Sequence, residues 1–212
     1  MEPDPSSRSL EVLLSAGLAE LGLPTDRCSA LAKLARLVSR WAERINLTAH
    51  RGPEAVARRL ILDALALGAS LPVVPPGSIV DLGSGAGFPG LPLAILWPAC
   101  EITLVDSRER KHHFQRSAIR ELALSNARAI RGRAEVLAAT PHQIVVAQAM
   151  AQPEQALEWI RGWTTPEGWL VLPQSESAPG VIAPAGVRFE SIRRYQVPLG
   201  GPARALWLGR VS

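Results

Sequence analysis

The stretch Ser78-Ile-Val-Asp-Leu-Gly-Ser-Gly-Ala-Gly-Phe-Pro-Gly90 decides the fold of this chain. An apolar run over 79–82 predicts a β-strand, four glycines follow within eight residues, and an apolar helix is predicted directly after them. Glycines let such a loop turn tightly and let a ligand lie against the backbone without an intervening Cβ. The free N–H groups of the following helix can donate to a polar or anionic group. The stretch therefore predicts a ligand site where a strand passes into a helix.

The spacing of the glycines fits two kinds of ligand. From Gly83 it is G-x-G-x-G, the methyltransferase spacing, and from Gly85 it is G-x-G-x-x-G, the dinucleotide spacing. Gly83 follows the strand almost at once, and Asp81 would repel a pyrophosphate but could meet a cationic group. S-adenosylmethionine, an adenosine with an amino-acid tail, is therefore the favoured ligand. A nicotinamide-dependent oxidoreductase and a tight turn that binds nothing are the alternatives.

A second acid ends the next predicted strand. Asp106 lies 25 residues after Asp81, close to the spacing at which an acid meets the ribose hydroxyls in doubly wound folds. Asp106 and Ser107 also suit the N-cap of the following helix, and one residue can serve both roles. A third strand leads into Gly132-Arg-Ala-Glu135, a loop that lies beside the adenine in folds of this class.

Strands and helices alternate after the glycine loop. The predicted strands are 79–82, 102–106, 127–130, 143–147 and 169–173, and the predicted helices are 90–97, 108–123 and 153–163. Such alternation implies a parallel sheet with right-handed crossovers. Two further strand-like runs, 188–197 and 203–211, flank Pro-Leu-Gly-Gly-Pro and predict an antiparallel hairpin at the edge of the sheet.

The part of the chain before the sheet is predicted to be helical. Leucine-rich stripes with helical spacing run from about residue 9 to residue 71, and the Pro/Gly-rich segment 72–77 leads into the first strand. We expect an N-terminal helical extension over 1–71 and an α/β domain over 72–212.

Composition narrows the functional class. The 212 residues are 47% hydrophobic, enough for a sizeable core, and no apolar run is as long as a membrane span. The N-terminus lacks the basic and apolar regions of a signal peptide. Two distant cysteines and four histidines without ligand spacing indicate a cytoplasmic protein without a metal site. Residues 108–133 carry eight Lys/Arg against two Glu, which suggests a phosphate-contacting surface, with a solvated helix face as the alternative.

Three stretches resemble the RsmG (GidB) family of bacterial methyltransferases, which act on guanine N7 in small-subunit ribosomal RNA. They are Trp41-Ala-Glu-Arg-Ile-Asn-Leu-Thr48, the loop from Asp81 to Pro92, and Asp106-Ser107 with Arg110, Lys111, Phe114 and the segment 132–135. The similarity extends from about residue 10 to residue 211, and Phe-Pro-Gly-Leu-Pro after the loop is its most specific part.

The resemblance implies an α/β class I S-adenosylmethionine-dependent methyltransferase fold, Rossmann-like, with a mostly parallel sheet and a C-terminal antiparallel hairpin. Its expected cofactor contacts are Asp81, Gly83, Ser84, Gly85, Gly87, Phe88, Asp106, Ser107, Ala134, Glu135 and Gln148. Arg110 and Lys111 are expected to contact RNA. The expected partner is 16S ribosomal RNA or the small ribosomal subunit, bound by a monomer. No general base is expected, because the N7 lone pair is already free, and no metal is expected, because the histidines and cysteines lack ligand spacing.

The chain departs from the family pattern at three positions. Gln148, in the segment 147–150, stands where the family has an arginine, Pro173 where it has a lysine, and Leu60 where it has a histidine. These replacements raise the alternative of a noncatalytic or weakly active relative that binds RNA or the ribosome. Methylation of a small molecule is a further alternative, which the basic stretch disfavours.

Overall fold

The structure is a computed structural model of the 212-residue chain, and it describes residues 5–148, 152–177 and 180–211. Met150, in the segment aligned with the family's arginine, lies outside the described residues.

One seven-stranded sheet forms the centre of the molecule, in the order β3-β2-β1-β4-β5-β7-β6. The strands are β1 (Ser78–Leu82), β2 (Glu101–Asp106), β3 (Ala127–Arg131), β4 (His142–Ala147), β5 (Thr164–Ser175), β6 (Val187–Gln196) and β7 (Ala203–Val211). The first five are parallel, whereas β7 runs antiparallel to β5 and β6. The predicted parallel sheet and C-terminal hairpin are confirmed, with β7 inserted between β5 and the edge strand β6.

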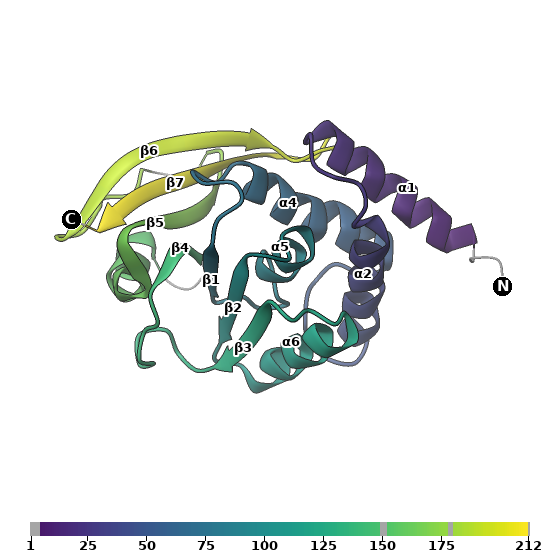
Figure 1. Cartoon of the computed structure of the whole chain (residues 1–212), viewed down its shortest axis with the longest axis horizontal. Coiled ribbons are helices and arrows are strands. Elements are labelled where there is room, and N and C mark those ends of the chain that lie inside the picture. The colour runs from purple at the N-terminus through teal and green to yellow at the C-terminus, as the bar shows by residue number, and fades with distance from the viewer. Residues whose placement is uncertain (1–4, 149–151, 178–179, 212) are drawn as a thin grey trace.

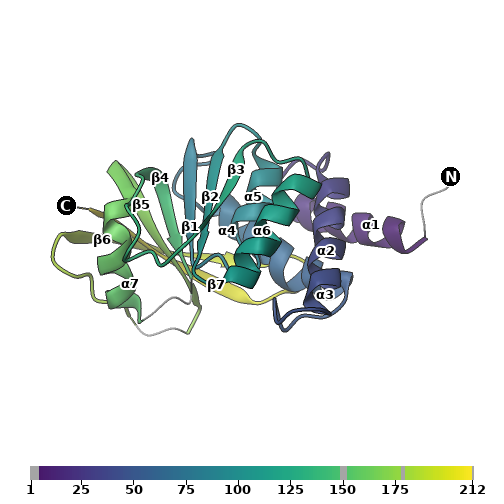
Figure 2. The ribbon, with the colours of Figure 1, turned by 90° about the horizontal axis from the view of Figure 1, so that it is seen from below.

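The helices lie on both faces of this sheet. They are α1 (Pro5–Glu20), α2 (Cys28–Ala42), α3 (Pro53–Val56), α4 (Leu62–Ala69), α5 (Gly90–Leu96), α6 (Glu109–Glu121) and α7 (Pro153–Ile160). A π-helical segment, η1 (Ala57–Ile61), joins α3 to α4, and a 3₁₀ turn, η2 (Arg161–Trp163), follows α7. Figure 2 shows α7 on one side of the sheet and α4, α5 and α6 on the other.

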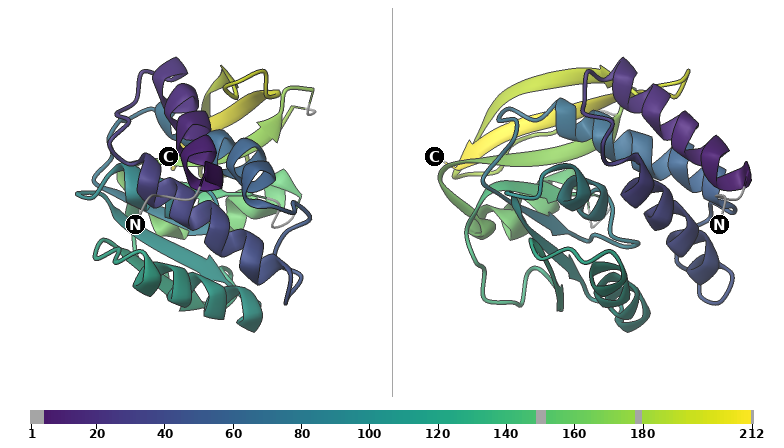
Figure 3. Two further views of the ribbon diagram at one scale, coloured as in Figure 1. Left: turned by 90° about the vertical axis from the view of Figure 1, so that its right-hand side faces the viewer. Right: turned by 45° about the vertical axis from the view of Figure 1, so that its right-hand side comes forward.

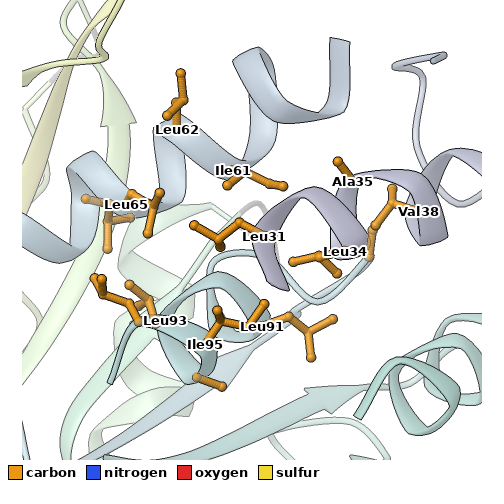
Figure 4. Close-up of a cluster of buried hydrophobic side chains, with 14 of the residues drawn as sticks. Leu31, Leu34, Ala35, Val38, Ile61, Leu62, Leu65, Leu91, Leu93 and Ile95 are labelled. Atoms are coloured by element: carbon orange, nitrogen blue, oxygen red, sulfur yellow. The ribbon is translucent and has the colours of Figure 1, made fainter. Parts of the chain in front are cut away.

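The N-terminal helices form a layer outside α5, with α2 also reaching α6 (Figures 1 and 3). Leu31 and Leu34 of α2 are fully buried in the cluster that also holds Ile61, Leu91 and Ile95 (Figure 4). These helices therefore complete the same hydrophobic core as one face of the sheet. A boundary between folding units near residue 72 stays a prediction.

The C-terminal hairpin returns to the N-terminal layer. Arg193 Nη1 of β6 donates to the carbonyl oxygens of Ser70 and Leu71, at 2.9 and 2.7 Å. The backbone N–H of Leu199, in the turn of the hairpin, donates to the carboxylate of Glu20 at 3.0 Å. Figure 1 shows this turn beside the end of α1. These contacts tie the hairpin to the N-terminal helices.

Among the helices of the described residues, none combines the length and apolar character required to cross a bilayer.

Candidate active site

The glycine loop crosses the carboxyl ends of β1 and β2. The backbone N–H groups of Gly83 and Ser84 both donate to the carbonyl oxygen of Val105, at 2.9 and 3.1 Å. Gly83 and Gly87 have φ angles of 75° and 79°, a region that L side chains rarely adopt. A Cβ at Gly87 would also overlap the side chain of Leu91. The loop conformation therefore requires glycine at these positions.

Asp106 fixes the loop to the end of β2. Its side chain is 7% exposed, Oδ2 accepts from the N–H of Gly85 at 2.9 Å, and Oδ1 accepts from the N–H of Arg108 at 2.8 Å. The N-cap of α6 is Arg108, so the predicted N-cap role of Asp106 is wrong, because the helix begins two residues later than that role needs. A carboxylate has about four acceptor sites, and Asp106 retains capacity for further donors.

A cavity of about 440 Å³, here called the loop cavity, opens beside the loop. Its lining is Gly83, Val105, Asp106, Ser107, Arg108, Lys111, Gly132, Arg133, Ala134, Glu135, Gln148 and Trp159. Six of the predicted cofactor residues are thus brought together from four loops that follow β1, β2, β3 and β4. The indole N–H of buried Trp163 donates to the carbonyl oxygen of Ala134 at 3.2 Å and holds the loop after β3 in place.

Asp81 lies fully buried beneath the glycine loop. Oδ2 accepts from the N–H of Gly90 at 2.9 Å, but within the described residues Oδ1 has no hydrogen-bond partner. Burial raises the pKa of Asp81 well above its usual value, and the bond from Gly90 only partly opposes this. A buried acceptor without a donor is costly, and the ammonium group of an amino-acid ligand is the kind of donor that this position lacks. The residues present therefore fit S-adenosylmethionine.

Neighbouring residues of α6 have different surroundings. Lys111 is half-buried and lines the loop cavity, while Arg110 is exposed. Burial lowers the pKa of Lys111, and the nearby Asp106 carboxylate opposes this shift. Gln115, one turn further along, donates to Ser84 Oγ and to the carbonyl oxygen of Gly85, both at 2.9 Å. The sequence prediction treated Arg110 and Lys111 alike, although the helical period places Lys111 and Gln115 on one face. Their predicted contact with RNA stays a prediction.

A second cavity of about 400 Å³, here called the hairpin cavity, lies between α4, the end of β4 and the C-terminal hairpin. Gln148 lines both cavities, so the two meet at this side chain. Phe88, predicted as a cofactor contact, lines the hairpin cavity instead of the loop cavity. Leu60 and Pro173 line it as well. All three departures from the family pattern therefore border this second cavity.

Three polar side chains form one cluster in the hairpin cavity. The hydroxyl of Tyr195 donates to Asp63 Oδ1 at 3.1 Å, and Arg204 donates to Asp63 Oδ2 through Nε at 3.3 Å and Nη2 at 3.2 Å. Burial raises the pKa of Tyr195, with the Asp63 charge adding to the shift, so this phenol remains a donor. Asp63, Tyr195 and Arg204 were not among the predicted site residues, although Asp63 follows by three residues the departure from the family pattern at Leu60.

The outer face of α6 carries the basic charge. Arg110, Arg116 and Arg120 are exposed, and in the part of the chain that the structure describes none of them has an ion-pair partner. The described residues also contain no group of three or more His, Cys, Asp or Glu that could hold a metal ion.

A sheet of this order, with a glycine loop after β1 and an acid at the end of β2, defines a class I S-adenosylmethionine-dependent methyltransferase fold. The family model of rRNA small subunit methyltransferase G (GidB) matches residues 27–184. The chain belongs to this family.

Individual relatives agree with this membership. The ribosomal RNA small subunit methyltransferase G of Stenotrophomonas maltophilia is 42% identical over 142 residues, which cover 67% of this chain and 66% of the relative. The protein of the same name from Chromohalobacter salexigens is 35% identical over 200 residues, covering 92% of this chain and 95% of the relative. The solved structure of Aeropyrum pernix fibrillarin with bound S-adenosyl-L-methionine has a TM-score of 0.52 at 19% identity, covering 72% of this chain and 75% of that one. This last similarity concerns the fold alone.

Proposed function

We propose that the protein transfers a methyl group from S-adenosylmethionine to N7 of a guanine in small-subunit ribosomal RNA. The observation that carries the proposal is the junction of two cavities at Gln148. A methyl donor in the loop cavity and a nucleobase in the hairpin cavity would meet there, in a chain of the rRNA small subunit methyltransferase G family.

Named residues would hold the donor. Asp106 would accept from the ribose hydroxyls, and Ala134 and Glu135 would lie at the adenine. Asp81 lines neither cavity and lies buried beneath the glycine loop, where its unsatisfied oxygen would be paired, directly or through water, with the ammonium group. The partly buried ammonium of Lys111 would contact the same ligand from α6. Charge-assisted hydrogen bonds of this kind are about twice as strong as neutral ones.

The reaction requires the protein mainly to position the methyl donor and the guanine relative to each other. When bound, S-adenosylmethionine supplies an electrophilic methyl group on a sulfonium. The N7 lone pair of guanine would form the new bond to this carbon in line with the C–S bond, whose electrons would stay with the sulfur. No proton has to be removed from N7 before attack, so a general base is unnecessary. Holding two reactants in line can supply about 7–11 kcal/mol of the barrier reduction.

The exposed arginines of α6 support an RNA substrate. Arg110, Arg116 and Arg120 offer charges that neutralise phosphates in a sequence-independent way. A ribosomal RNA substrate implies that the protein acts in the cytoplasm. The protein would act as a monomer, since one chain supplies the lining of both cavities.

The test is to map N7-methylguanine in small-subunit ribosomal RNA from cells with and without the gene, and to restore it with the purified protein and S-adenosylmethionine. Gly83→Val should abolish both cofactor binding and methylation, because φ at Gly83 is 75° and the residue lines the loop cavity. Gly22→Val is the matched control, since Gly22 has φ of 66° in a turn away from both cavities. Unchanged methylation in the deletion strain would refute the proposal.

A second candidate is a relative that binds RNA without methylating it. The specific observation is that Gln148 and Pro173, which border the hairpin cavity, replace a family arginine and lysine. Retained affinity for S-adenosylmethionine and RNA, together with no methyl transfer by the wild type and transfer by Gln148→Arg, would favour this candidate.

A further inference from the structure

The hairpin cavity contains a carboxylate with an unused acceptor position. Asp63 Oδ2 already accepts two hydrogen bonds from Arg204, whereas Oδ1 accepts one within the described residues, from Tyr195. Each carboxylate oxygen has about two acceptor sites, so Oδ1 can take one more donor. The Asp63 side chain is 21% exposed and lines the cavity, so that donor can come from a bound molecule.

The carboxylate is held rigidly in this orientation. Arg204 and Tyr195 are direct partners in the register of β6 and β7, and both reach Asp63 on α4. The guanidinium of Arg204, at 3.2 Å, supplies the opposite charge, and the tyrosine hydroxyl can only donate to a carboxylate. Asp63 is therefore presented to the cavity as a pure acceptor, with its geometry fixed by two other elements.

Gln148 and Asp63 line the same cavity from different elements. Gln148 follows β4 and also lines the loop cavity, whereas Asp63 lies on α4, where Arg204 of β7 holds it. A volume of about 400 Å³ is in the range of small-ligand pockets and can hold one nucleobase. A purine whose N7 faces the junction at Gln148 presents its opposite end to the rest of this lining, to which Asp63 belongs.

We propose that Asp63 is a specificity-determining residue, whose Oδ1 accepts a hydrogen bond from the 2-amino group of the target guanine. This inference rests on the function proposed above. Guanine carries the 2-amino group at the end of the ring system farthest from N7, while adenine and hypoxanthine lack it. An acceptor fixed at that position therefore selects guanine for methylation at N7. A base that lacks this donor leaves a partly buried carboxylate site without its partner, which is the more costly outcome.

The experiment combines a protein variant with a base analogue. Small-subunit RNA is prepared with guanine or inosine at the mapped target position, and kcat/KM for methyl transfer is measured for the wild type and Asp63→Asn. The wild type should prefer guanine by about 10–100-fold, the scale of a hydrogen bond to a charged group. In Asp63→Asn the donors of Arg204 hold the amide oxygen on their own side, so the amide NH₂ replaces Oδ1 and faces the 2-amino group. The preference for guanine should then fall to threefold or less, because two donors face each other and neither accepts a hydrogen bond from the other.

Asp26→Asn is the matched control, because it makes the same chemical change in an exposed ion pair with Arg27. It should retain the wild-type preference. Both variants should bind S-adenosylmethionine as the wild type does, since Asp63 lies outside the loop cavity.

The outcomes separate the two proposals. A wild type that methylates guanine and inosine equally well overturns the role of Asp63, even if Asp63→Asn does not fold. A guanine preference that survives in folded Asp63→Asn overturns it as well. A wild type that methylates neither RNA overturns the proposed function and, with it, this inference.

Discussion

Asp106 is expected to have two separable roles, which one substitution can reveal. Asp106→Ala removes the acceptor for the N–H of Gly85, 2.9 Å away, and the acceptor proposed for the ribose hydroxyls. The first loss lowers the free energy of unfolding of the ligand-free protein, and the second weakens only the binding of S-adenosylmethionine. Two measurements on one variant therefore distinguish the two roles.

The structure sets the size of each effect. The N–H of Gly85 is partly buried and would lose its partner, which costs about 1–3 kcal/mol of the free energy of unfolding. The N–H of Arg108, whose hydrogen bond to Asp106 is also partly buried, loses its acceptor as well and adds to this cost. Asp106 is 7% exposed, so its bond to the ribose is little screened. Loss of that charge-assisted bond should weaken the binding of S-adenosylmethionine by about 1.5–3 kcal/mol, roughly 10–150-fold in Kd.

Gln115→Ala is the matched control for bracing of the loop. Gln115 donates to Ser84 Oγ and to the carbonyl oxygen of Gly85 but does not line the loop cavity. Its removal should lower the free energy of unfolding by about 1–2 kcal/mol and change Kd by less than about threefold, which is under 1 kcal/mol. Unfolding in urea gives the first quantity, and isothermal titration with S-adenosylmethionine gives the second. If Asp106→Ala weakens binding no more than Gln115→Ala does, Asp106 only braces the loop and the ribose assignment is refuted.

Three further changes test other parts of the molecule. Gln148→Arg should raise the affinity for S-adenosylmethionine or the rate of methyl transfer, because an arginine adds a permanent charge and a fixed set of donors where the two cavities meet; if both stay unchanged in a folded protein, the family's arginine has no counterpart at this position. Arg110→Glu should reduce the dependence of RNA affinity on salt by about 0.7–0.9 in log–log slope for each lost phosphate contact, with cofactor binding unchanged, and an unaltered slope would show that this residue is only solvated. Burial lowers the pKa of His142 below its ordinary value of 6.5, so the unfolded state binds more protons than the folded state as the pH falls below 6.5. The contribution of His142 to the free energy of unfolding should therefore be full above pH 6.5 and decrease as the pH falls. A His142→Gln protein whose free energy of unfolding falls as steeply between about pH 7 and pH 5 would contradict this.

The sequence predicted the fold class and the core of the candidate cofactor site because their signals are local. The segment 78–106 contains apolar residues with strand spacing, glycines at adjacent turns and an acid near the end of each of two strands. Parallel strands place their carboxyl ends at one edge of a sheet, so the residues that follow β1, β2 and β3 had to converge. The parallel pairing of β1 with β2 and of β2 with β3 brings residues of these loops into one cavity.

Only the tertiary structure showed that the N-terminal helices complete the core of the sheet. The leucine stripes predicted helices with one apolar face, but such a stripe does not specify its partner. Leu31 and Leu34 pack against Leu91 and Ile95 of α5, more than fifty residues away in the chain (Figure 4). The packing of α6 against the glycine loop likewise determines that the side chain of Lys111 lines the loop cavity.

The hairpin cavity shows most clearly what local sequence does not determine. Asp63 is separated by 132 residues from Tyr195 and by 141 residues from Arg204, yet the three side chains form one hydrogen-bonded cluster. These hydrogen bonds form because β7 lies between β5 and β6 in the sheet and because α4 packs against β6. Strand spacing and helical period describe each element alone, whereas the meeting of distant elements is fixed by how their apolar faces pack. The chemistry of the glycine loop could therefore be predicted from the sequence, and the cavity beside it could be found only in the folded chain.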